Sequence, residues 1–514
     1  MPIGNAQMNI AGGIREFAVS MRNNPAVIDG DRVLSYGELH ERSNRLATAL
    51  LASGLGAGDR VAFLCGNRAE YFEVAAGLAK AGMVMVPLNP RSPAREVSFI
   101  IRHSGASALI LDDALAERAS DAVESLDLEV VLSMSGTTLG PDYEAALAGG
   151  SDTDPAHPVS ELDPFTIGYT SGTTADPKGV MISHRSRSLT FLATALEWGL
   201  GPLTRTIAVA PMYHGAGFAF AYAAVATGGT VSMLRSFDPE ELLAMVERDT
   251  IDSVFLVPTH AHVIRQLGES AIGRRDLSSL SVMYFNAAPL PQELKLWTLD
   301  TFPQVGVHEL YGSTEAGVVT DLRPPDQRRK ERCVGPPWFM TEVRIVDAEG
   351  DPVEPGEVGL LYSRSPYLMN GYWNNPEATE AVTTDDGFLT SGDLAMFDDE
   401  QFVYIVDRAK DMIISGGANV FPREIEEVLV THPSISEAAV IGRPSEKWGE
   451  EVAAIVVLAR GAAFDEAALE QHCRKELADY KIPRSYEVVE ALPRNAAGKT
   501  LKRELRETFG QPAG

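Results

Sequence analysis

Amphipathic segments of helical period alternate with short apolar segments along the first two thirds of the chain, and this alternation constrains the fold most. SYGELHERSNRLATALLASGL predicts a helix that begins at Ser35, carries a capping-box glutamate at Glu38 and ends near Gly54. DRVAFLC then predicts a strand and AEYFEVAAGLAKAGM the next helix, while VMVPLNP and SALILDD predict further strands. Strands and helices that alternate at these lengths form βαβ units on a parallel sheet. We therefore expect an α/β fold.

The pattern changes twice towards the C-terminus. From about 334 to 407 it consists of short alternating runs (TEVRIVD, VGLLYSRS, FVYIVD) between Gly/Pro/Asp turns, which predict a small β-rich antiparallel lobe. After Arg408 a unit of about a hundred residues follows, in which EEVAAIVVLA predicts a strand and AALEQHCRKELADYKIP a helix that ends before Pro483. The predicted domains are 1–407 and 412–514, with the boundary in DRAKDM.

Charge and cysteine content exclude several classes of function. A net charge of −27 argues against nucleic acid or an anionic membrane as the main partner. Three widely spaced cysteines predict neither a disulfide framework nor a zinc site, which favours a reducing cytoplasm, and we see no signal peptide at the N-terminus. The segment 207–234 lacks acidic and basic side chains, but Pro211, His214 and several glycines interrupt it. We expect it to be buried core and not a membrane span.

The stretch YTSGTTADPKGV, residues 169–180, combines hydroxyls, glycines and one lysine. It is no Walker loop, because Pro177 precedes Lys178 and Gly179 follows it. It is no nucleophile elbow either, because the serine after Gly168 comes one place late. Alone, it is as compatible with a surface loop as with an anion-binding loop.

Later motifs resolve this ambiguity. YGSTE (311–315), TSGD (390–393), DRAKDMIISGGANVFPREIEE (407–427) and PRNAAGK (493–499) follow in series. In this order and spacing the motifs resemble those of the adenylate-forming superfamily of acyl-CoA synthetases, non-ribosomal peptide adenylation domains and beetle luciferases. The resemblance covers nearly the whole chain, including VGPPWFMTEVRIVD and GYWNNPEAT.

The resemblance implies ATP-dependent activation of a carboxylic acid to an acyl-adenylate, with release of pyrophosphate, and then transfer to CoA. It also implies a large N-terminal domain of βαβ subdomains with a β-rich lobe, a hinge at 408–411 around Lys410, and a mobile α+β C-terminal domain. The first step brings two anions together, so catalysis depends on positioning and charge neutralisation. ATP, Mg²⁺ and CoA are the expected cofactors.

Site residues carry over from the matching motifs. Lys499 would bridge the acid and the α-phosphate, Glu315 would hold Mg²⁺ as hard-oxygen ligand, and Thr314 and His214 complete the catalytic set. Tyr311 would stack on adenine, and Asp393 and Arg408 would bind the ribose. The remaining nucleotide residues implied are Thr170, Ser171, Gly172, Thr173, Thr174, Lys178, Ala288, Glu309 and Gly312.

The acid and CoA sites follow from less specific matches. PMYHGAGF and FNAAPLP correspond to pocket segments, which implies that His214, Phe218, Tyr222 and Asn286 line the acid site. Asn286 stands where related ligases often carry glycine, so we expect a shortened cavity and a medium-sized, ring-containing or functionalised acid. CoA would contact Gly416, Gly417, Trp448, Tyr480 and Arg484, although Ile482 departs from ligases that have arginine there.

Several alternatives remain open at this stage. A free-standing adenylating enzyme could load a carrier protein or form an amide, and a catalytically dead protein could bind adenylates. Lys178, Glu315, Asp393, Arg408 and Lys499 are all present, which disfavours the dead protein. His260 and His262 have too few neighbours at ligand spacing for a metal site. The expected partners are therefore small molecules, without integral membrane association, and a homodimer is compatible with the resemblance.

Overall fold

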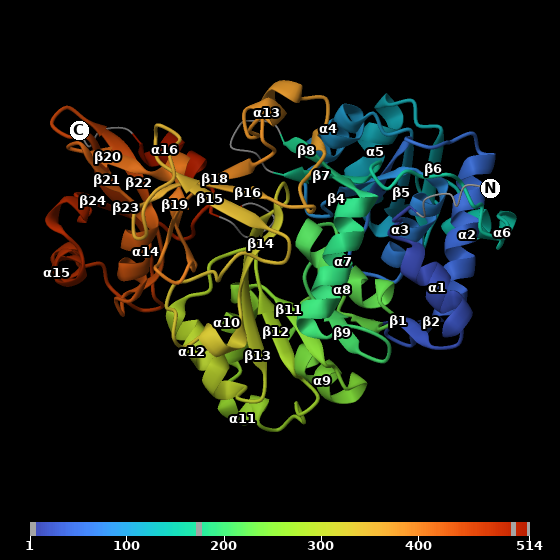
Figure 1. Cartoon of the computed structure of the whole chain (residues 1–514), viewed down its shortest axis with the longest axis horizontal. Coiled ribbons are helices and arrows are strands. Elements are labelled where there is room, and N and C mark those ends of the chain that lie inside the picture. The colour runs from blue at the N-terminus through green and yellow to red at the C-terminus, as the bar shows by residue number, and fades with distance from the viewer. Residues whose placement is uncertain (1–6, 171–176, 495–499, 511–514) are drawn as a thin grey trace. The chain divides into compact units, whose positions relative to one another are not determined.

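The computed structural model describes residues 7–170, 177–494 and 500–510 of the 514-residue chain. The chain divides into two compact units. Unit 1 comprises Met1–Glu331, Gly335–Glu342 and Arg364–Leu389, and unit 2 comprises Arg332–Val334, Val343–Ser363 and Thr390–Gly514. Figure 1 shows the helices and strands in chain order.

Unit 1 contains two sheets whose central strands are parallel, which confirms the expected α/β fold. The first sheet has the strand order β14-β13-β12-β11-β9-β10-β1-β2, with β2 and β14 antiparallel at its edges. Its strands are β1 (Pro25–Asp29), β2 (Arg32–Ser35), β9 (Arg205–Ala208), β10 (Thr230–Met233), β11 (Ser253–Leu256), β12 (Val282–Phe285), β13 (Gly306–Ser313) and β14 (Gly317–Leu322).

The second sheet has the order β17-β8-β7-β4-β3-β5-β6, and β7 with β8 forms an antiparallel hairpin. Its strands are β3 (Arg60–Leu64), β4 (Val84–Leu88), β5 (Ala108–Asp112), β6 (Val130–Met134), β7 (Pro164–Thr170), β8 (Lys178–Ser183) and β17 (Gly371–Tyr372). The parallel strands are almost continuously apolar because helices bury both faces of the sheet.

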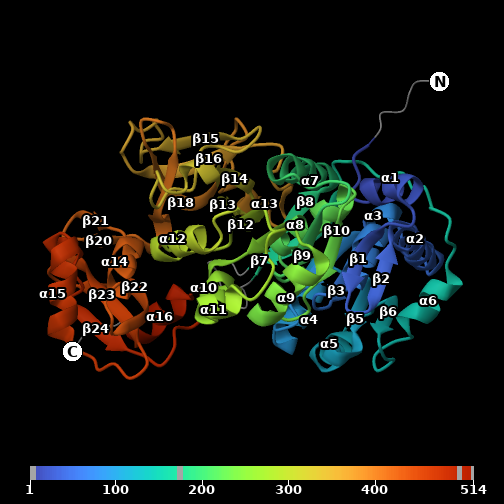
Figure 2. The same cartoon turned by 90° about the horizontal axis from the view of Figure 1, so that it is seen from below.

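Helices of unit 1 connect and cover these sheets, and α7 packs along α8, as Figure 2 also shows. The α-helices are α1 (Gly12–Ser20), α2 (Tyr36–Ala52), α3 (Glu70–Ala81), α4 (Ala94–Ser104), α5 (Ala116–Ser125), α6 (Tyr143–Gly149), α7 (His184–Trp198), α8 (Gly215–Ala226), α9 (Pro239–Asp249), α10 (Pro258–Gln266), α11 (Glu269–Ile272), α12 (Gln292–Thr301) and α13 (Pro376–Glu380). Two short 3₁₀ helices are η1 (Asp113–Leu115) and η2 (Pro324–Asp326).

The predicted start of α2 is confirmed in detail. The Ser35 side chain accepts a hydrogen bond from the Glu38 amide, and the Glu38 carboxylate accepts one from the Ser35 amide. The apolar stretch 207–234 forms part of β9, the buried helix α8 and β10, as expected for core. In the described part of the chain no helix is long and apolar enough to cross a membrane.

Unit 2 holds a four-stranded sheet with the order β15-β16-β18-β19 and a five-stranded sheet in which β24 pairs in parallel with β23. The strands are β15 (Glu342–Val346), β16 (Gly359–Arg364), β18 (Leu389–Phe397), β19 (Val403–Arg408), β20 (Ile413–Ser415), β21 (Ala418–Val420), β22 (Ile435–Ser445), β23 (Gly449–Leu458) and β24 (Ser485–Val488). Helices α14 (Pro422–Val430), α15 (Glu466–Glu476) and α16 (Lys502–Phe509) complete it, with the 3₁₀ turns η3 (Ala409–Asp411) and η4 (Asp479–Lys481).

One predicted helix is shorter than its sequence pattern. The helix expected to run up to Pro483 ends at Glu476, because Leu477 takes an extended backbone with φ −119° and ψ 147°. That conformation turns the Leu477 side chain into the core of unit 2, where it is 8% exposed. The β-rich lobe clusters with the C-terminal residues in unit 2, and residues 408–411 lie inside that unit, so the hinge stays a prediction.

Candidate active site

The carboxyl ends of β9, β11, β12 and β13 lie along one edge of the first sheet, because these neighbouring strands are parallel. His214 follows β9 and Asn286 follows β12, while Tyr311 lies near the end of β13 and Glu315 in the turn after it. Segments far apart in the sequence therefore meet at one edge. Ligands of open α/β sheets bind at this edge.

The glycine- and hydroxyl-rich loop joins β7 to β8. Thr170 and Lys178 are paired across the hairpin at the end next to this loop. Ser171, Gly172, Thr173 and Thr174 lie outside the described residues. The Lys178 ammonium lies over the ring of Tyr372, 5.0 Å from its centroid, because β17 pairs with β8.

Tyr372 also contacts the YGSTE motif. Its hydroxyl donates a hydrogen bond of 3.0 Å to Glu315 Oε1, and the pKa of Tyr372 is raised by burial and, after it, by the Glu315 charge. One tyrosine thus contacts Lys178 through its ring face and Glu315 through its hydroxyl. An ammonium and a carboxylate from motifs about 140 residues apart are held on either side of it.

The turn that carries Thr314 and Glu315 requires a glycine. A Cβ on Gly312 would lie 2.0 Å from the Gly317 carbonyl oxygen, at the irregularity in the β13–β14 register. Thr314 Cγ2 lies 3.9 Å from where a Cβ on Gly168 would sit, so this turn and the start of the β7–β8 loop are adjacent. Tyr311 precedes the same irregularity.

Glu309 is a buried member of β13 and 6% exposed. Its Oε2 lies 2.6 Å from Lys295 Nζ of α12, and its Oε1 accepts a 3.3 Å hydrogen bond from the Leu290 amide. These contacts fix the 286–290 loop to the sheet. The nucleotide contact that the sequence predicts for Glu309 stays a prediction.

The 286–290 loop is strained at its start. Ala287 adopts φ 74°, a left-handed conformation that non-glycine residues rarely take, and Asn286 Oδ1 accepts a 2.5 Å hydrogen bond from the Ala287 amide. Ala288, the predicted nucleotide contact, is exposed. The Asn286 side-chain oxygen is therefore bonded within the loop, and its amide nitrogen is the group that could face a ligand.

The predicted acid-pocket aromatics lie in a packed cluster. Phe218 is 4% exposed and Tyr222 is fully buried, and their ring centroids are 4.9 Å apart. Tyr222 also stacks on Phe72 and Phe191 at 5.7 and 5.2 Å. His214 occupies the N-cap position of α8 at the end of this cluster. Sequence reasoning missed Arg187, a basic residue in the first turn of α7, which lies beside Gly215.

Unit 2 carries the other predicted residues. Asp393 and Arg408 are paired across β18 and β19, with 2.9 Å between Asp393 Oδ1 and Arg408 Nε. Both predicted ribose ligands therefore lie together. Lys410 lies in η3, and Lys499 lies outside the described residues.

Two of the predicted CoA residues, Arg484 and Gly416, lie against the indole ring of a third, Trp448. The guanidinium carbon of Arg484 is 4.4 Å from the centroid of Trp448, and a Cβ on Gly416 would lie 2.9 Å from the same ring. Gly416 and Gly417 both have positive φ, 61° and 82°, so the β20–β21 turn needs glycine there. Tyr480 is 43% exposed on η4.

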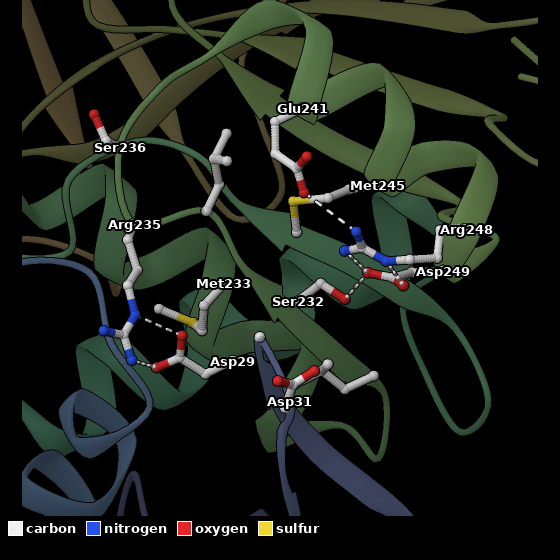
Figure 3. A pocket seen from close by; sticks show the side chains of 13 residues that line it. Asp29, Asp31, Ser232, Met233, Arg235, Ser236, Glu241, Met245, Arg248 and Asp249 are labelled. Atoms are coloured by element: carbon white, nitrogen blue, oxygen red, sulfur yellow. Dashed lines mark hydrogen bonds and ion pairs between the residues drawn. The ribbon is translucent and has the colours of Figure 1, made fainter.

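Unit 1 also contains a polar pocket of about 540 Å³ near the ends of β1 and β10 (Figure 3). Arg235 donates two hydrogen bonds to Asp29, and Asp249 accepts bonds from Ser232 and Arg248. These charged side chains neutralise one another. The side chains of Glu197, His308 and Asp321 lie close enough together to hold a cation. Their polar atoms already have partners, however, because Arg323 donates two hydrogen bonds to Glu197 and His308 pairs with Asp321.

Comparison with known proteins agrees with this geometry. The profile of the AMP-binding enzyme family matches residues 14–373, and that of the AMP-binding enzyme C-terminal domain matches 424–499. A feruloyl-CoA synthase of Amycolatopsis is 38% identical over 94% of this chain and 96% of its own length. A 2-succinylbenzoate–CoA ligase of Geobacillus kaustophilus is 35% identical over 94% of each chain.

Among solved structures, the amide bond synthetase McbA from Marinactinospora thermotolerans superposes with a TM-score of 0.87 at 32% identity, over 98% of this chain and 100% of its own. The predicted resemblance to the adenylate-forming superfamily and its fold are thereby confirmed.

Proposed function

The chain belongs to the AMP-binding enzyme family, and we propose that it activates a compact, functionalised carboxylic acid. It is an AMP-forming acid–thiol ligase: ATP and the acid give an acyl-adenylate and pyrophosphate, and CoA then takes the acyl group and releases AMP. The acid, the residue roles and the metal are the parts that we propose.

The arrangement of Lys178, Tyr372 and Glu315 carries the proposal. In the adenylation step the acid carboxylate attacks the α-phosphate, so negative charge gathers on the pyrophosphate leaving group. Lys178 supplies a cation at the loop, and Tyr372 holds Glu315 beside it. Both groups are preorganised before ATP arrives, which is how electrostatic stabilisation lowers a barrier.

Mg²⁺ fits the Glu315 side of this arrangement. Mg²⁺ prefers hard oxygen ligands and keeps several waters, so one positioned carboxylate together with phosphate oxygens suffices. The Tyr372 hydroxyl fixes Glu315 Oε1 in place. When bound, the ion would neutralise phosphate charge.

We assign the remaining roles from position. Tyr311 and Gly312 at the end of β13, with Ala288, flank the adenine, and Asp393 and Arg408 bind the ribose. Lys499 neutralises charge in the first step only. The stacked pair of Trp448 and Arg484, with the glycine turn at 416–417, receives CoA in the second step, after rotation at Lys410.

The acid is compact because Asn286 occupies a position that related ligases often leave to glycine. Two relatives are named for acids that contain a ring, a feruloyl-CoA synthase and a 2-succinylbenzoate–CoA ligase. These names support a preference for a compact, ring-containing or functionalised acid. We also propose a cytoplasmic enzyme that works without integral membrane association. Its partners are small molecules, and a homodimer is compatible with its family.

The test is an acid-dependent assay with three acceptors. The protein is incubated with ATP, Mg²⁺ and ferulate, 2-succinylbenzoate or medium-chain acids, and CoA, an amine or a carrier protein is added. We expect pyrophosphate release that depends on the acid, and a thioester with CoA. Product formation with the amine or the carrier protein but not with CoA would instead support the alternative of a free-standing adenylating enzyme.

A further inference from the structure

Arg187 is a basic side chain in the first turn of α7, and the described residues provide no counter-charge for it. Its guanidinium carbon lies 6.0 Å from the centroid of Phe165, and one of its terminal nitrogens lies 3.9 Å from where a Cβ on Gly215 would sit. Gly215 directly follows His214 of the predicted acid pocket. Arg187 therefore reaches from α7 to the start of α8, at the acid site.

No hydrogen bond or ion pair of Arg187 is found with any described residue, and its Nε is both shielded from solvent and without an acceptor. Other partly buried arginines of unit 1 differ, since Arg42 pairs with Glu73 and Glu144, and Arg68 with Glu70 and Asp112. Burial alone lowers the pKa of Arg187 to about 10. No nearby charge offsets the loss of hydration.

The position within the helix makes this charge more unfavourable. The first turn of a helix has exposed N–H groups and favours negative charge, so a cation there is disfavoured. An unpaired buried charge is costly, and a methionine or leucine would fill a similar volume without that cost. Packing therefore gives no reason for an arginine, whereas an anionic ligand does.

The β7–β8 hairpin shows which end of the ligand meets Arg187. Thr170 pairs with Lys178 at the phosphate-loop end, and Pro164 pairs with Ser183 at the other. These two ends are about 17 Å apart at the usual rise per residue. Arg187 follows Ser183 by one helical turn, and Phe165 lies beside Pro164. Arg187 thus lies away from the loop that would hold the phosphates.

We propose that Arg187 binds a second carboxylate at the far end of the acid, so that the substrate is a compact dicarboxylic acid. This inference rests on the proposed acid activation and narrows its substrate. A guanidinium matches a carboxylate with two parallel hydrogen bonds, and the pair becomes neutral. A phenol or amide oxygen would accept one bond and leave the charge in place. The stacked rings of Phe165 and Phe218, 5.9 Å apart, provide an apolar wall beside this anchor.

The first test uses matched acids. The pairs are hexanoate with hexanedioate, and 3-phenylpropanoate with 3-(4-carboxyphenyl)propanoate, and the 4-carbamoyl analogue serves as a neutral isostere. Pyrophosphate release gives kcat/KM for each acid. We expect wild type to prefer a diacid, and Arg187→Met to lower kcat/KM for that diacid about 10- to 100-fold. The matched monoacid and the carbamoyl acid should change by less than about threefold.

The control is Arg185→Met, an exposed arginine on the same helix whose side chain is 50% exposed. Arg185→Met should leave the ratio of kcat/KM for the diacid to kcat/KM for the monoacid unchanged. Arg187→Lys should retain part of the wild-type preference for the diacid. Equal losses on monoacid and diacid in Arg187→Met would overturn the inference while leaving the proposed acid activation intact. So would a wild-type preference for the monoacid in both pairs.

A second readout needs no turnover. Removing a partly buried cation that has no ion pair with the described residues should raise the Tm of the free protein by about 1–3 °C in Arg187→Met. The favoured diacid should raise the Tm of wild type but not that of the variant. A lower Tm in the variant, with equal stabilisation of both proteins by the diacid, would show a structural role and contradict the inference. If no acid releases pyrophosphate, the proposed function fails, and this thermal comparison still decides the role of Arg187.

Discussion

Two charged regions of unit 1 contrast with each other. In the pocket of Figure 3, Asp29 pairs with Arg235, and Asp249 pairs with Arg248. At the candidate active site, Lys178 lies over an aromatic ring, Arg187 lies beside one, and neither has an ion pair within the described residues. In the first region both arginines therefore already have carboxylate partners within the protein.

The contrast indicates what each region is for. The paired charges neutralise one another and contribute to holding β1, β10 and α9 together. A cation without a counter-charge instead lowers the stability of the free protein, and a bound anion removes this cost. Sites are often less stable than the protein could make them, because function needs groups that folding does not satisfy.

The largest expected effect is on catalysis at the candidate active site, where Lys178 lies. Lys178→Met should lower the rate of adenylate formation on the order of 10²–10³-fold, because one preorganised charge is lost from the developing pyrophosphate. The Tm should change little, since Lys178 makes no ion pair with the described residues. The measurement is pyrophosphate release with a fixed acid.

Arg248→Met, from the paired pocket, is the matched control and should keep wild-type rates. If the two variants lose activity equally, the distinction between the regions is wrong.

The next effect is on the stability of the pocket in Figure 3, where Asp29 pairs with Arg235. Asp29→Ala removes a carboxylate that is 5% exposed, along with its bonds to Arg235 and to the Ala69 amide. The Arg235 side chain is 63% exposed and can hydrate, so most of the loss comes from the buried N–H of Ala69. We expect the free energy of unfolding to fall by about 2 kcal/mol, with kcat of the folded enzyme unchanged.

Urea unfolding of Asp29→Ala measures this loss. Asp31→Ala, an exposed neighbour in the same turn, should have little effect, and Asp29→Asn should fall in between because it keeps an acceptor for Ala69. A stable Asp29→Ala protein with reduced kcat would mean that the pocket takes part in the reaction.

The smallest effect, at most about 1.4 kcal/mol for each pH unit, concerns a buried cation whose hydrogen-bond partners are neutral. Lys80 on α3 is fully buried, and its partners are neutral: His40, Ser43 Oγ at 2.6 Å and Asn44 Oδ1 at 2.7 Å. Burial lowers the pKa of Lys80 to about 7, with Asp154 opposing the shift and Arg15 adding to it.

The unfolded chain, with a lysine pKa of about 10.4, binds more protons between pH 7 and that value. Stability should therefore rise with pH from about 7 upwards, by at most about 1.4 kcal/mol per pH unit, and should be flat below. Urea unfolding between pH 6 and 9, relative to Lys80→Met, isolates this term. A difference that stays constant over the whole range would mean that Lys80 keeps its normal pKa in the fold.

Local and long-range features differ in how far the sequence predicts them. The capping box at Ser35 and Glu38, the strands 60–64 and 84–88, and the break of the 207–234 stretch are local, and the sequence predicts each. The contact of Tyr372 with both Lys178 and Glu315 depends on the pairing of β17 with β8, which no local pattern contains. The end of α15 at Glu476 depends on where Leu477 finds a core.

Arg187 shows the same limit at the site. A basic residue in the first turn of a helix is a weak signal, because most such residues point to solvent. Only the fold reveals that its guanidinium is turned to Phe165 and Gly215 and meets no carboxylate of the described chain. Motifs predict the reaction, whereas the choice of acid depends on contacts between segments.

The most direct test of the central claim is exchange of labelled pyrophosphate into ATP in the absence of CoA. We expect the exchange to require both Mg²⁺ and an acid, and to be fastest with a compact diacid. In Lys178→Met the exchange rate should fall on the order of 10²–10³-fold. Folded wild-type protein that shows no exchange with any acid, or exchange only when CoA is present, would contradict it.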